Sequence, residues 1–568
     1  MTGIDWLIVG AYMAASLWIG FSLTRRASSS LSEFFLSGRN LPWWLAGTSM
    51  VATTFSADTP LYVTGLVRQH GIYENWQWWA LLLSGMLAVF VFARYWRRAG
   101  VMTDVELIEL RYGGRPAAVL RGFKAVYFAF FIHTIIKAQV ILAMVKILDV
   151  AVGWGKWEVI AVASIVTIAY ALASGYWGVV WTDFFQIIVA MAGAVLLAVY
   201  AVDAAGGLVT LPARIADSGR AEALSFLPPA GLDVWSPAVI AFAGYLGLVW
   251  WSRYSVDGGG VIVQRMASCR TEKDALAATF FFNITHYAVR TWPWILAALA
   301  SLVLYPSITD HESVYAVMMM DLLPTGARGL MLASLLAAFM STLSSYLNLS
   351  SAYFVNDFYK RFIRPHASER HHVLAARLSM LGLSVITGIV TYQVESIVGV
   401  FKFLLAFGSG TGLVMLLRWF WWRVNAWTEI AAIAVSMGLS FLAYLVPPFA
   451  AWSYSSKLVL IIAGSALAAF IVTLATSPVP FDRLRQFYRL VQPPALGWRP
   501  VSGPHGGDGG LFVRDVTHWA YGVTLVLGAT IGPGLLLLGR LSAGAGILLV
   551  SGLAGFLLAR SVGRRGWV

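Results

Sequence analysis

One apolar segment, residues 337–351, carries more small polar side chains than a lipid-facing helix tolerates. It reads AAFMSTLSSYLNLSS, and seven of its residues are serine, threonine or asparagine. Hydroxyl and amide groups gain nothing from hydrocarbon, so in a membrane helix they face protein, water or an ion. At helical spacing Ser341, Ser345 and Asn348 share one stripe, which Thr342 and Ser344 flank. Clustered uncharged oxygens suit a hard monovalent cation that must leave again.

The hydroxyls could also serve structure alone, in either of two ways. Serine and threonine in membrane helices often hydrogen-bond to the carbonyl four residues earlier. They also mark places where two helices pack closely. The density of hydroxyls next to alanines favours the ion site over both.

The composition is that of a polytopic membrane protein. Hydrophobic residues make up 59% of the 568 residues, charged residues make up 12%, and the mean hydropathy is +0.73. Soluble domains carry about 25% charged residues. Spans of about 20 apolar residues predict about fifteen helices, near residues 4–24, 41–67, 75–96, 119–149, 157–174, 177–202, 234–256, 275–304, 328–357, 372–393, 396–421, 425–447, 457–476, 516–538 and 542–560.

The net charge of +13 reflects membrane topology and not nucleic-acid binding. Cations gather in alternate loops, for example Arg25 and Arg26, Arg94 to Arg98, and Arg483 to Arg489, whereas the other loops hold scattered cations only. Loops rich in lysine and arginine face the cytoplasm. This predicts a multi-pass protein of the cytoplasmic membrane, with its N-terminus outside and its C-terminus inside. The first span lacks a preceding cation and so does not resemble a cleaved signal peptide.

The polar residues give little support to an enzyme. The lone Cys269 excludes a disulfide framework and a cysteine-based metal site. Of nine histidines only His133 and His286 lie well inside spans, whereas a membrane haem enzyme needs several as axial ligands. We therefore expect no cofactor other than a coupling ion. The lipid bilayer is an expected partner, and no obligate protein partner is evident.

Two spans are interrupted in corresponding places. The first break is Ser56-Ala57-Asp58-Thr59-Pro60 within 41–67, where the proline removes a donor and crowds the preceding turn. The second follows Trp250 and leads into Asp257-Gly258-Gly259-Gly260. The breaks lie five spans apart, and broken helices at matching positions of two halves indicate an inverted-repeat transporter with its site at the repeat interface. A proline kink that serves packing alone is the alternative.

Five regions follow from these patterns. They are a leading transmembrane helix and cytoplasmic loop (1–40), a region that contains both interrupted spans (41–424), two further transmembrane helices (425–477), a cytoplasmic connector rich in proline and glycine (478–515), and a C-terminal transmembrane hairpin (516–568). Within the connector, residues 481–491 have apolar and basic residues at amphipathic spacing, which predicts a helix on the inner leaflet.

Several motifs resemble the sodium:solute symporter family. They are SGRNLPWW at 37–44, WTDFFQ at 181–186, VQR at 263–265, the polar segment from Ala338 to Asn348, and NDFYK at 356–360. The resemblance covers about residues 4–425. It implies an all-α polytopic LeuT-type fold. Residues 41–424 would form a ten-helix inverted-repeat transport core of two five-helix repeats, with one leading helix and about four trailing helices.

The resemblance also implies the ion sites. The main sodium site would use backbone carbonyls of Ala52, Phe55 and Ala338 with the hydroxyls of Ser341 and Thr342. A second sodium site, present in some members, would use Asp183, Ser341, Ser344 and Ser345. Alternatively, Asp183 only hydrogen-bonds the hydroxyl stripe.

The solute pocket of the family faces the first broken helix, where this chain has Asp58 and Thr59. Sugar-transporting members often place a longer acid and an amide there, so the solute class stays open. Ionisable residues at mid-membrane depth are expected to be functional, which adds Lys137 and Arg290. A salt bridge between Asp58 and Lys137 is the structural alternative. The remaining candidates, Trp250, Trp251 and Tyr254, would stack on a solute or only pack.

We therefore expect a sodium-coupled symporter that imports a small polar organic solute (sugar-like, amino acid or carboxylate) by alternating access, and not an enzyme. Two alternatives stay open. A proton-coupled symporter of the same fold would titrate Asp183 or Asp58 in place of binding sodium. A solute-sensing membrane module would use the same fold for signalling.

Overall fold

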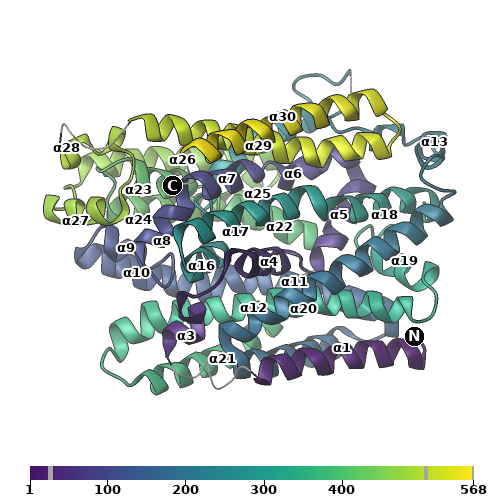
Figure 1. Cartoon of the computed structure of the whole chain (residues 1–568), viewed down its shortest axis with the longest axis horizontal. Helices are drawn as coiled ribbons and strands as arrows, with labels where there is room; N and C mark the ends of the chain where they lie inside the picture. The colour runs from purple at the N-terminus through teal and green to yellow at the C-terminus, as the bar shows by residue number, and fades with distance from the viewer. Residues whose placement is uncertain (23–29, 230, 504–508, 566–568) are drawn as a thin grey trace.

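Long helices run side by side along one common direction in the computed structural model, which describes residues 1–22, 30–229, 231–503 and 509–565 (Figure 1). Within these ranges, nine helices are long and apolar enough to cross a membrane, or ten if the bent pair α22 and α23 counts as one span. The expected total of about fifteen also counts spans whose helices are broken into shorter pieces. The expected cations Arg25 and Arg26, and the connector residues 504–508, lie outside the described residues.

The first half of the chain contains α1 (Gly3–Ser22), α3 (Leu31–Leu36), η1 (Ser37–Arg39), α4 (Trp43–Thr54), α5 (Asp58–His70), η2 (Ile72–Asn75), α6 (Trp76–Trp79), α7 (Leu82–Leu87), η3 (Ala88–Phe92), α8 (Ala93–Ala99), α9 (Leu107–Arg111), α10 (Gly114–Tyr127), η4 (Phe128–Ile132), α11 (His133–Val152), α12 (Lys156–Ala204), α13 (Leu211–Asp217) and η5 (Ala221–Leu224). The long helix α12 is divided at Gly175, whose combination of φ 53° and ψ −156° is readily adopted only by glycine. This division matches the two predicted spans at 157–174 and 177–202.

The second half contains α14 (Pro237–Gly244), η6 (Tyr245–Val249), α15 (Trp250–Ser252), α16 (Gly260–Ser268), α17 (Glu272–Ile284), η7 (Thr285–Val289), α18 (Thr291–Leu304), α19 (Val314–Leu322), α20 (Ala327–Ala352), η8 (Tyr353–Ile363), α21 (Glu369–Gln393), α22 (Ile397–Phe407) and α23 (Gly412–Phe420). The trailing elements are α24 (Ala426–Leu445), α25 (Pro447–Ala450), α26 (Tyr454–Ala475), α27 (Phe481–Val491), η9 (Ala495–Gly497), α28 (Arg499–Ser502), α29 (Gly509–Leu537) and α30 (Leu541–Arg565).

Both predicted breaks occur, with one shift. Helix α4 ends at Thr54, Phe55 leaves the helical region with φ −91° and ψ 84°, and α5 begins at Asp58. The break therefore lies at 55–57, and the predicted break residues Asp58, Thr59 and Pro60 form the first turn of α5. Proline fits there because the first turn of a helix does not need its N–H.

The second break separates α15 from α16. The backbone is extended at Arg253, with φ −77° and ψ 152°. Gly258, Gly259 and Gly260 then take φ values of 115°, 56° and 41°, in the left-handed region that favours glycine. The glycine tract lets the chain turn sharply before α16 starts.

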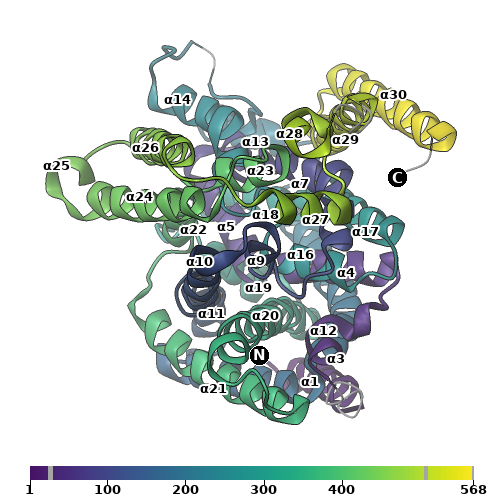
Figure 2. The same cartoon turned by 90° about the vertical axis from the view of Figure 1, so that its left-hand side faces the viewer.

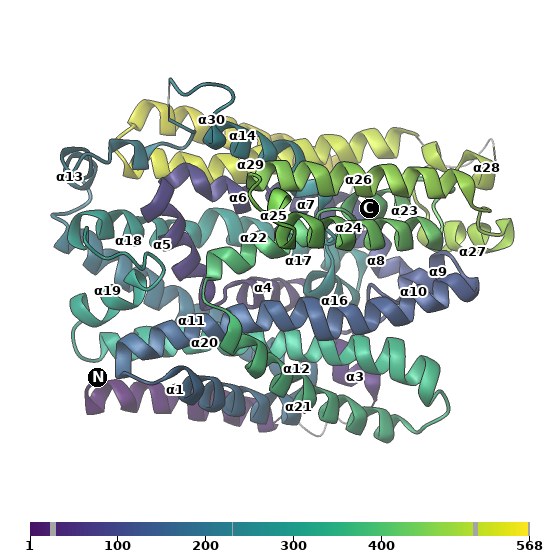
Figure 3. The same cartoon turned by 180° about the vertical axis from the view of Figure 1, so that it is seen from behind.

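The trailing helices lie at the edges of the molecule. Viewed along the helices, α29 and α30 form a pair at one corner, and α24 and α26 lie at another (Figure 2). From behind, α24 and α26 run next to each other (Figure 3). Helix α4 packs against α12, α16, α17 and α20, so the first break lies inside the helix assembly.

Helix α27, which the sequence predicts to be amphipathic, packs several of its apolar residues on the protein. Its apolar residues Leu484, Phe487 and Val491 are buried, and the guanidinium of Arg111 lies 5.3 Å from the ring centre of Phe487 and 4.6 Å from that of Trp498. Part of the apolar side of the helix therefore packs on the protein, whereas Phe481 and Leu490 of the same helix are exposed. Arg111 and Trp498 contribute a cation and an aromatic surface to this packing.

Candidate functional site

The end of α4 meets α20 at the first break. The hydroxyl of Thr342 donates a hydrogen bond to the backbone oxygen of Thr53 at 2.8 Å. All five residues expected to form the main sodium site are at most 3% exposed: Ala52, Phe55, Ala338, Ser341 and Thr342. The last turn of a helix leaves carbonyl oxygens without intrahelical partners. The backbone oxygen of Ala52 accepts the N–H of Phe55 at 3.1 Å and keeps a second lone pair. Uncharged hydroxyl and carbonyl oxygens from two elements meet here, and such ligands are chemically suited to sodium.

The second expected sodium site contains a cation of the protein itself. The hydroxyl of Ser341 donates to one carboxylate oxygen of Asp183 at 2.6 Å, and that of Ser49 donates to the other at 2.5 Å. The guanidinium of Arg265, on α16, lies 3.5 Å from the same carboxylate. It also donates to the hydroxyl of Ser345 at 2.7 Å.

Further hydroxyls complete the surroundings of Arg265. Its nitrogens donate to Thr53 at 2.6 Å and to Ser49 at 3.1 Å. The fourth expected ligand, Ser344, donates to the backbone oxygen of Ser341 at 3.1 Å. We refer to Asp183, Arg265, Ser49, Thr53, Ser341 and Ser345 as the Asp183–Arg265 cluster. The negative charge of Asp183 offsets the positive charge of Arg265. Every member of the cluster is at most 1% exposed.

Much of the polar stripe of α20 is therefore used in bonds between helices. Asn348 accepts a hydrogen bond from Gln264 at 2.9 Å, and Ser351 donates to the backbone oxygen of Ala376 at 2.9 Å. Close packing of polar helices, one of the alternatives that the sequence left open, accounts for these two side chains. Thr342 differs from them because it borders a cavity.

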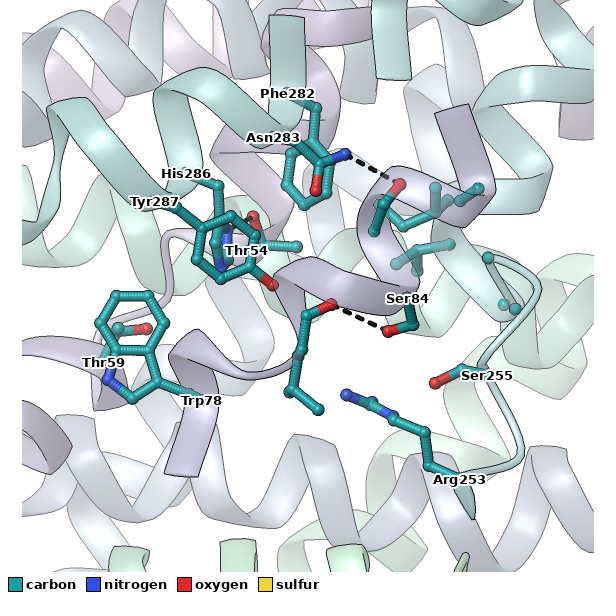
Figure 4. Close-up of a pocket in the computed structure, with 18 of the residues that line it drawn as sticks. Thr54, Thr59, Trp78, Ser84, Arg253, Ser255, Phe282, Asn283, His286 and Tyr287 are labelled. Carbon is teal, nitrogen blue, oxygen red and sulfur yellow. Dashed lines mark hydrogen bonds between the residues drawn. The ribbon is translucent and has the colours of Figure 1, made fainter. Parts of the chain in front are cut away.

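Two adjacent cavities lie at the breaks. The larger has a volume of about 280 Å³ and the smaller about 210 Å³. Each is smaller than the roughly 300–1,000 Å³ of typical small-molecule sites. Figure 4 shows the larger one, with Arg253 and Ser255 on one side and His286 and Tyr287 on another. The two cavities share seven lining residues: Thr54, Asp58, Thr59, Arg253, Tyr254, Tyr346 and Phe401.

Most of the predicted solute residues reach this region. Asp58 accepts a hydrogen bond from Gln139 at 2.8 Å, and Thr59 accepts one from the backbone N–H of Ser56 at 3.3 Å. Arg290 lines the larger cavity, donates to the backbone oxygen of Val51 at 3.1 Å, and contacts the ring of His286. Tyr254 lines both cavities.

Three predicted residues lie outside both cavities. Trp250 stacks on Trp519 of α29 with 6.3 Å between ring centres, and the indole N–H of Trp251 donates to the backbone oxygen of Gly247 at 2.6 Å. Lys137 is fully buried, and in the described part of the chain its ammonium has no hydrogen-bond partner. The proposed Asp58–Lys137 salt bridge is absent among the described residues, because Asp58 faces Gln139 instead.

Sequence reasoning missed Arg253, Gln139 and Asn283 as cavity residues. A usable signal existed for Arg253 only. It is a charged residue placed directly at the second helix break, between Ser252 and Tyr254. Gln139 and Asn283 lie in continuous helices, where only the three-dimensional packing shows which side of the helix meets the cavity.

A family model and the similar known proteins both assign this chain to one family of transporters. The family model for "Sodium:solute symporter family" matches residues 34–435. The chain is similar to sodium/glucose cotransporter 1 of Oryctolagus cuniculus, at 26% identity over 459 residues, which cover 73% of this chain and 67% of the relative. It is also similar to a sodium/glucose cotransporter of Vibrio parahaemolyticus, at 22% identity over 476 residues, which cover 78% and 86%.

A solved structure supports the fold. A sodium-coupled sialic acid symporter in a substrate-bound, outward-open state superposes with a TM-score of 0.72 at 20% identity, over 84% of this chain and 99% of that chain. The predicted all-helical transporter fold is thereby confirmed. Since the family model covers well over half of the 568 residues, the chain belongs to the sodium:solute symporter family.

Proposed function

We propose that this protein imports a small polar organic solute by sodium-coupled symport with alternating access, and that sodium binds where α4 ends against α20. One observation carries the proposal: the oxygens expected to hold sodium lie in the same broken segment that lines the cavities. Thr53, Thr54, Asp58 and Thr59 belong to this segment, and Thr342 faces it from α20. The named relatives are sodium/glucose cotransporters, which supports a polar organic solute.

Shared backbone provides a route for coupling. An ion bound to the carbonyls of Ala52 and Phe55 would hold the end of α4 in place, and Asp58 follows three residues after Phe55. Sodium would thus order the residues that the solute contacts, and the solute would in turn favour sodium binding, because such coupling is reciprocal. The driving force is adequate, since one sodium supplies about 2.3 kcal/mol per 100 mV and about 1.4 kcal/mol per tenfold gradient.

We further propose one coupling sodium and not two. The candidate second ligands Asp183, Ser341, Ser344 and Ser345 surround or adjoin the guanidinium of Arg265. Two unit charges about 4 Å apart repel by about 4 kcal/mol at an effective dielectric constant of 20. The guanidinium therefore takes the role of the second cation and competes with any sodium at that position.

The proposed orientation puts the N-terminus outside and the C-terminus in the cytoplasm, in the cytoplasmic membrane. Basic residues of several loops meet at one end of the molecule, which supports a common cytoplasmic side. Arg39 donates to the backbone oxygen of Val101 at 3.2 Å, and Arg97 donates to that of Cys269 at 2.8 Å. Arg483 donates to the backbone oxygen of Glu109 at 2.7 Å.

Sodium binding can be tested without knowing the solute. Purified protein in potassium-based buffer should gain thermal stability as sodium is added, with a saturable response and a Hill coefficient near 1. Exchange of Ser341 and Thr342 for alanine should remove this response, whereas Arg540→Gln, in the exposed turn between α29 and α30, should leave it unchanged. A response to pH alone, without any effect of sodium, would favour the proton-coupled alternative.

Transport itself requires an uptake measurement. In proteoliposomes, accumulation of a labelled solute from a panel of sugars, amino acids and organic acids should require an inward sodium gradient. Uptake that follows a proton gradient and ignores sodium would contradict the proposal. A Hill coefficient near 2 for sodium would contradict only the single-ion part.

A further inference from the structure

One charged side chain in the cavities has no partner among the described residues. Arg253 follows α15 directly, and its extended backbone directs the side chain into the larger cavity (Figure 4). It lines both cavities. Its Nε is buried without a hydrogen-bond partner, and no salt bridge to Arg253 occurs in the described ranges. A guanidinium stays protonated in proteins, so this group is a fixed positive charge.

The other charged groups of the cavity do not neutralise it. The ionic residues that line the two cavities are Asp58, Arg253 and Arg290. Arg290 is engaged by the backbone oxygen of Val51 and by His286, and Asp58 is engaged by Gln139. With neutral histidines, the lining has an excess of one positive charge. Arg253 is only partly buried, but its charge has no counter-charge in the lining. A solute that brings a negative charge therefore gains the most from this site.

Two acceptor oxygens in the same region also lack partners among the described residues. They are Oδ1 of Asp58 and Oδ1 of Asn283. Each needs a donor, such as a hydroxyl group of a solute, because a buried acceptor without a donor costs about 1–3 kcal/mol. The stacked rings of Trp78 and Tyr287, with 5.8 Å between ring centres, add an apolar wall.

We propose that the solute is a small hydroxylated carboxylate whose carboxylate group binds the guanidinium of Arg253, while its hydroxyl groups donate to Asp58 and Asn283. This assignment rests on the proposed sodium-coupled import and specifies its substrate class. Carboxylates match guanidinium groups well because two parallel N–H donors can meet two oxygens. A neutral sugar would satisfy Asp58 and Asn283 but would leave the charge of Arg253 without a counter-charge.

The charge of the cavity can be measured with a reporter that needs no solute. The chain has one cysteine, Cys269, which is buried. In a Ser255→Cys variant, the new thiol would lie in the cavity lining beside Arg253 (Figure 4). Its reaction rates with an anionic and a cationic methanethiosulfonate reagent are compared, each divided by the rate for a free thiol in solution.

We expect the anionic reagent to be favoured, and we expect Arg253→Gln to lower the anionic-to-cationic ratio about tenfold or more. Arg253→Lys should preserve most of the ratio, and Arg540→Gln should preserve all of it. The protein without Ser255→Cys gives the background from Cys269. An equal ratio with and without Arg253 would overturn the proposal, because the guanidinium would then not set the charge of the cavity.

The solute class is tested with matched probes. D-glucuronate and D-gluconate are compared with D-glucose and sorbitol, each at saturating sodium, for protection of the Ser255→Cys thiol. We expect the two carboxylates to slow labelling and the two neutral compounds to have little effect, and we expect Arg253→Gln to remove the difference. Equal protection by D-glucose and D-glucuronate would overturn the carboxylate assignment.

Failure of this inference differs from failure of the proposed function. If neutral sugars protect as well as carboxylates do, and only when sodium is present, sodium-coupled import stands and the substrate class is wrong. If carboxylates protect equally in potassium buffer, the substrate class stands and the coupling to sodium is wrong.

Discussion

Arg253 and Arg265 lie twelve residues apart on either side of the second helix break, yet their surroundings are opposite. Arg265 is bonded to Ser49, Thr53 and Ser345 and lies 3.5 Å from Asp183. Arg253 lines two cavities, and the described residues offer it neither a hydrogen bond nor a salt bridge. The guanidinium of Arg265 is thus bonded to other protein groups, whereas that of Arg253 is available to a ligand in the cavities.

The difference separates structural charge from functional charge. A buried cation with a full set of protein partners holds helices in register, and its removal disturbs the fold. A cation in a cavity without partners contributes little to the fold and is available to a ligand. The following predictions are ordered by expected size, and each tests one side of this distinction.

The largest effect is expected from breaking the Asp183–Arg265 pair. Asp183→Asn should leave the guanidinium without its counter-charge and lower the free energy of unfolding by about 3–5 kcal/mol. The measurement is thermal unfolding in detergent, together with the yield of monodisperse protein.

The double variant Asp183→Asn with Arg265→Gln is the decisive control. Because it removes both charges, it should be more stable than either single variant. If the double variant is no more stable than Asp183→Asn alone, the two charges do not compensate each other.

The next prediction distinguishes the role of the Thr342 hydroxyl from that of the neighbouring Ser341 hydroxyl. Thr342 donates to the backbone of Thr53 and borders the smaller cavity, whereas Ser341 donates to Asp183. Thr342→Ala should raise the half-saturating sodium concentration about tenfold, or about 1.4 kcal/mol, with unfolding nearly unchanged. Ser341→Ala should do the same and also destabilise the fold by about 1–3 kcal/mol, because an oxygen of Asp183 loses its donor. Identical profiles for the two variants would contradict this division.

Arg253 should show the reverse of the behaviour of Arg265. Arg253→Gln should change the free energy of unfolding by less than about 1 kcal/mol, since no hydrogen bond or salt bridge within the described residues is lost. It should weaken solute-dependent stabilisation or uptake at least about tenfold, because a charge-assisted hydrogen bond contributes about 1.5–3 kcal/mol. The two quantities are measured on the same preparation. A variant that unfolds as readily as Arg265→Gln would show that Arg253 is structural.

The sequence predicted the helical membrane fold and both breaks, because hydropathy, Pro60 and the glycines at 258–260 are local signals. It also indicated the chemistry of the hydroxyl stripe on α20. It could not tell which hydroxyls face an ion and which bind another helix. That distinction depends on the position of Arg265, which lies about 80 residues earlier in the chain.

Packing over long distances also explains why three of the predicted solute residues lie outside both cavities. The tryptophans at 250 and 251 are adjacent to a true break, but α29 lies beside the first of them and provides a stacking partner from residue 519. The proposed partner of Lys137 was chosen for its opposite charge, whereas the structure places the neutral Gln139, two residues further along α11, against Asp58.

Lys137 gives the smallest expected effect and the strictest test of the comparison. Like Arg253 it is a basic residue without a hydrogen-bond partner in the described ranges, but it is fully buried and lies outside both cavities. An unpaired lysine at mid-membrane depth costs free energy, so Lys137→Met should raise the free energy of unfolding by roughly 1 kcal/mol. Solute affinity should change by less than about twofold. Thermal unfolding and solute-dependent protection of the Ser255→Cys thiol measure the two quantities. Loss of solute binding in Lys137→Met would show that a charge outside the cavities serves the solute in another state of the transport cycle, and that the cavity lining alone does not define the site.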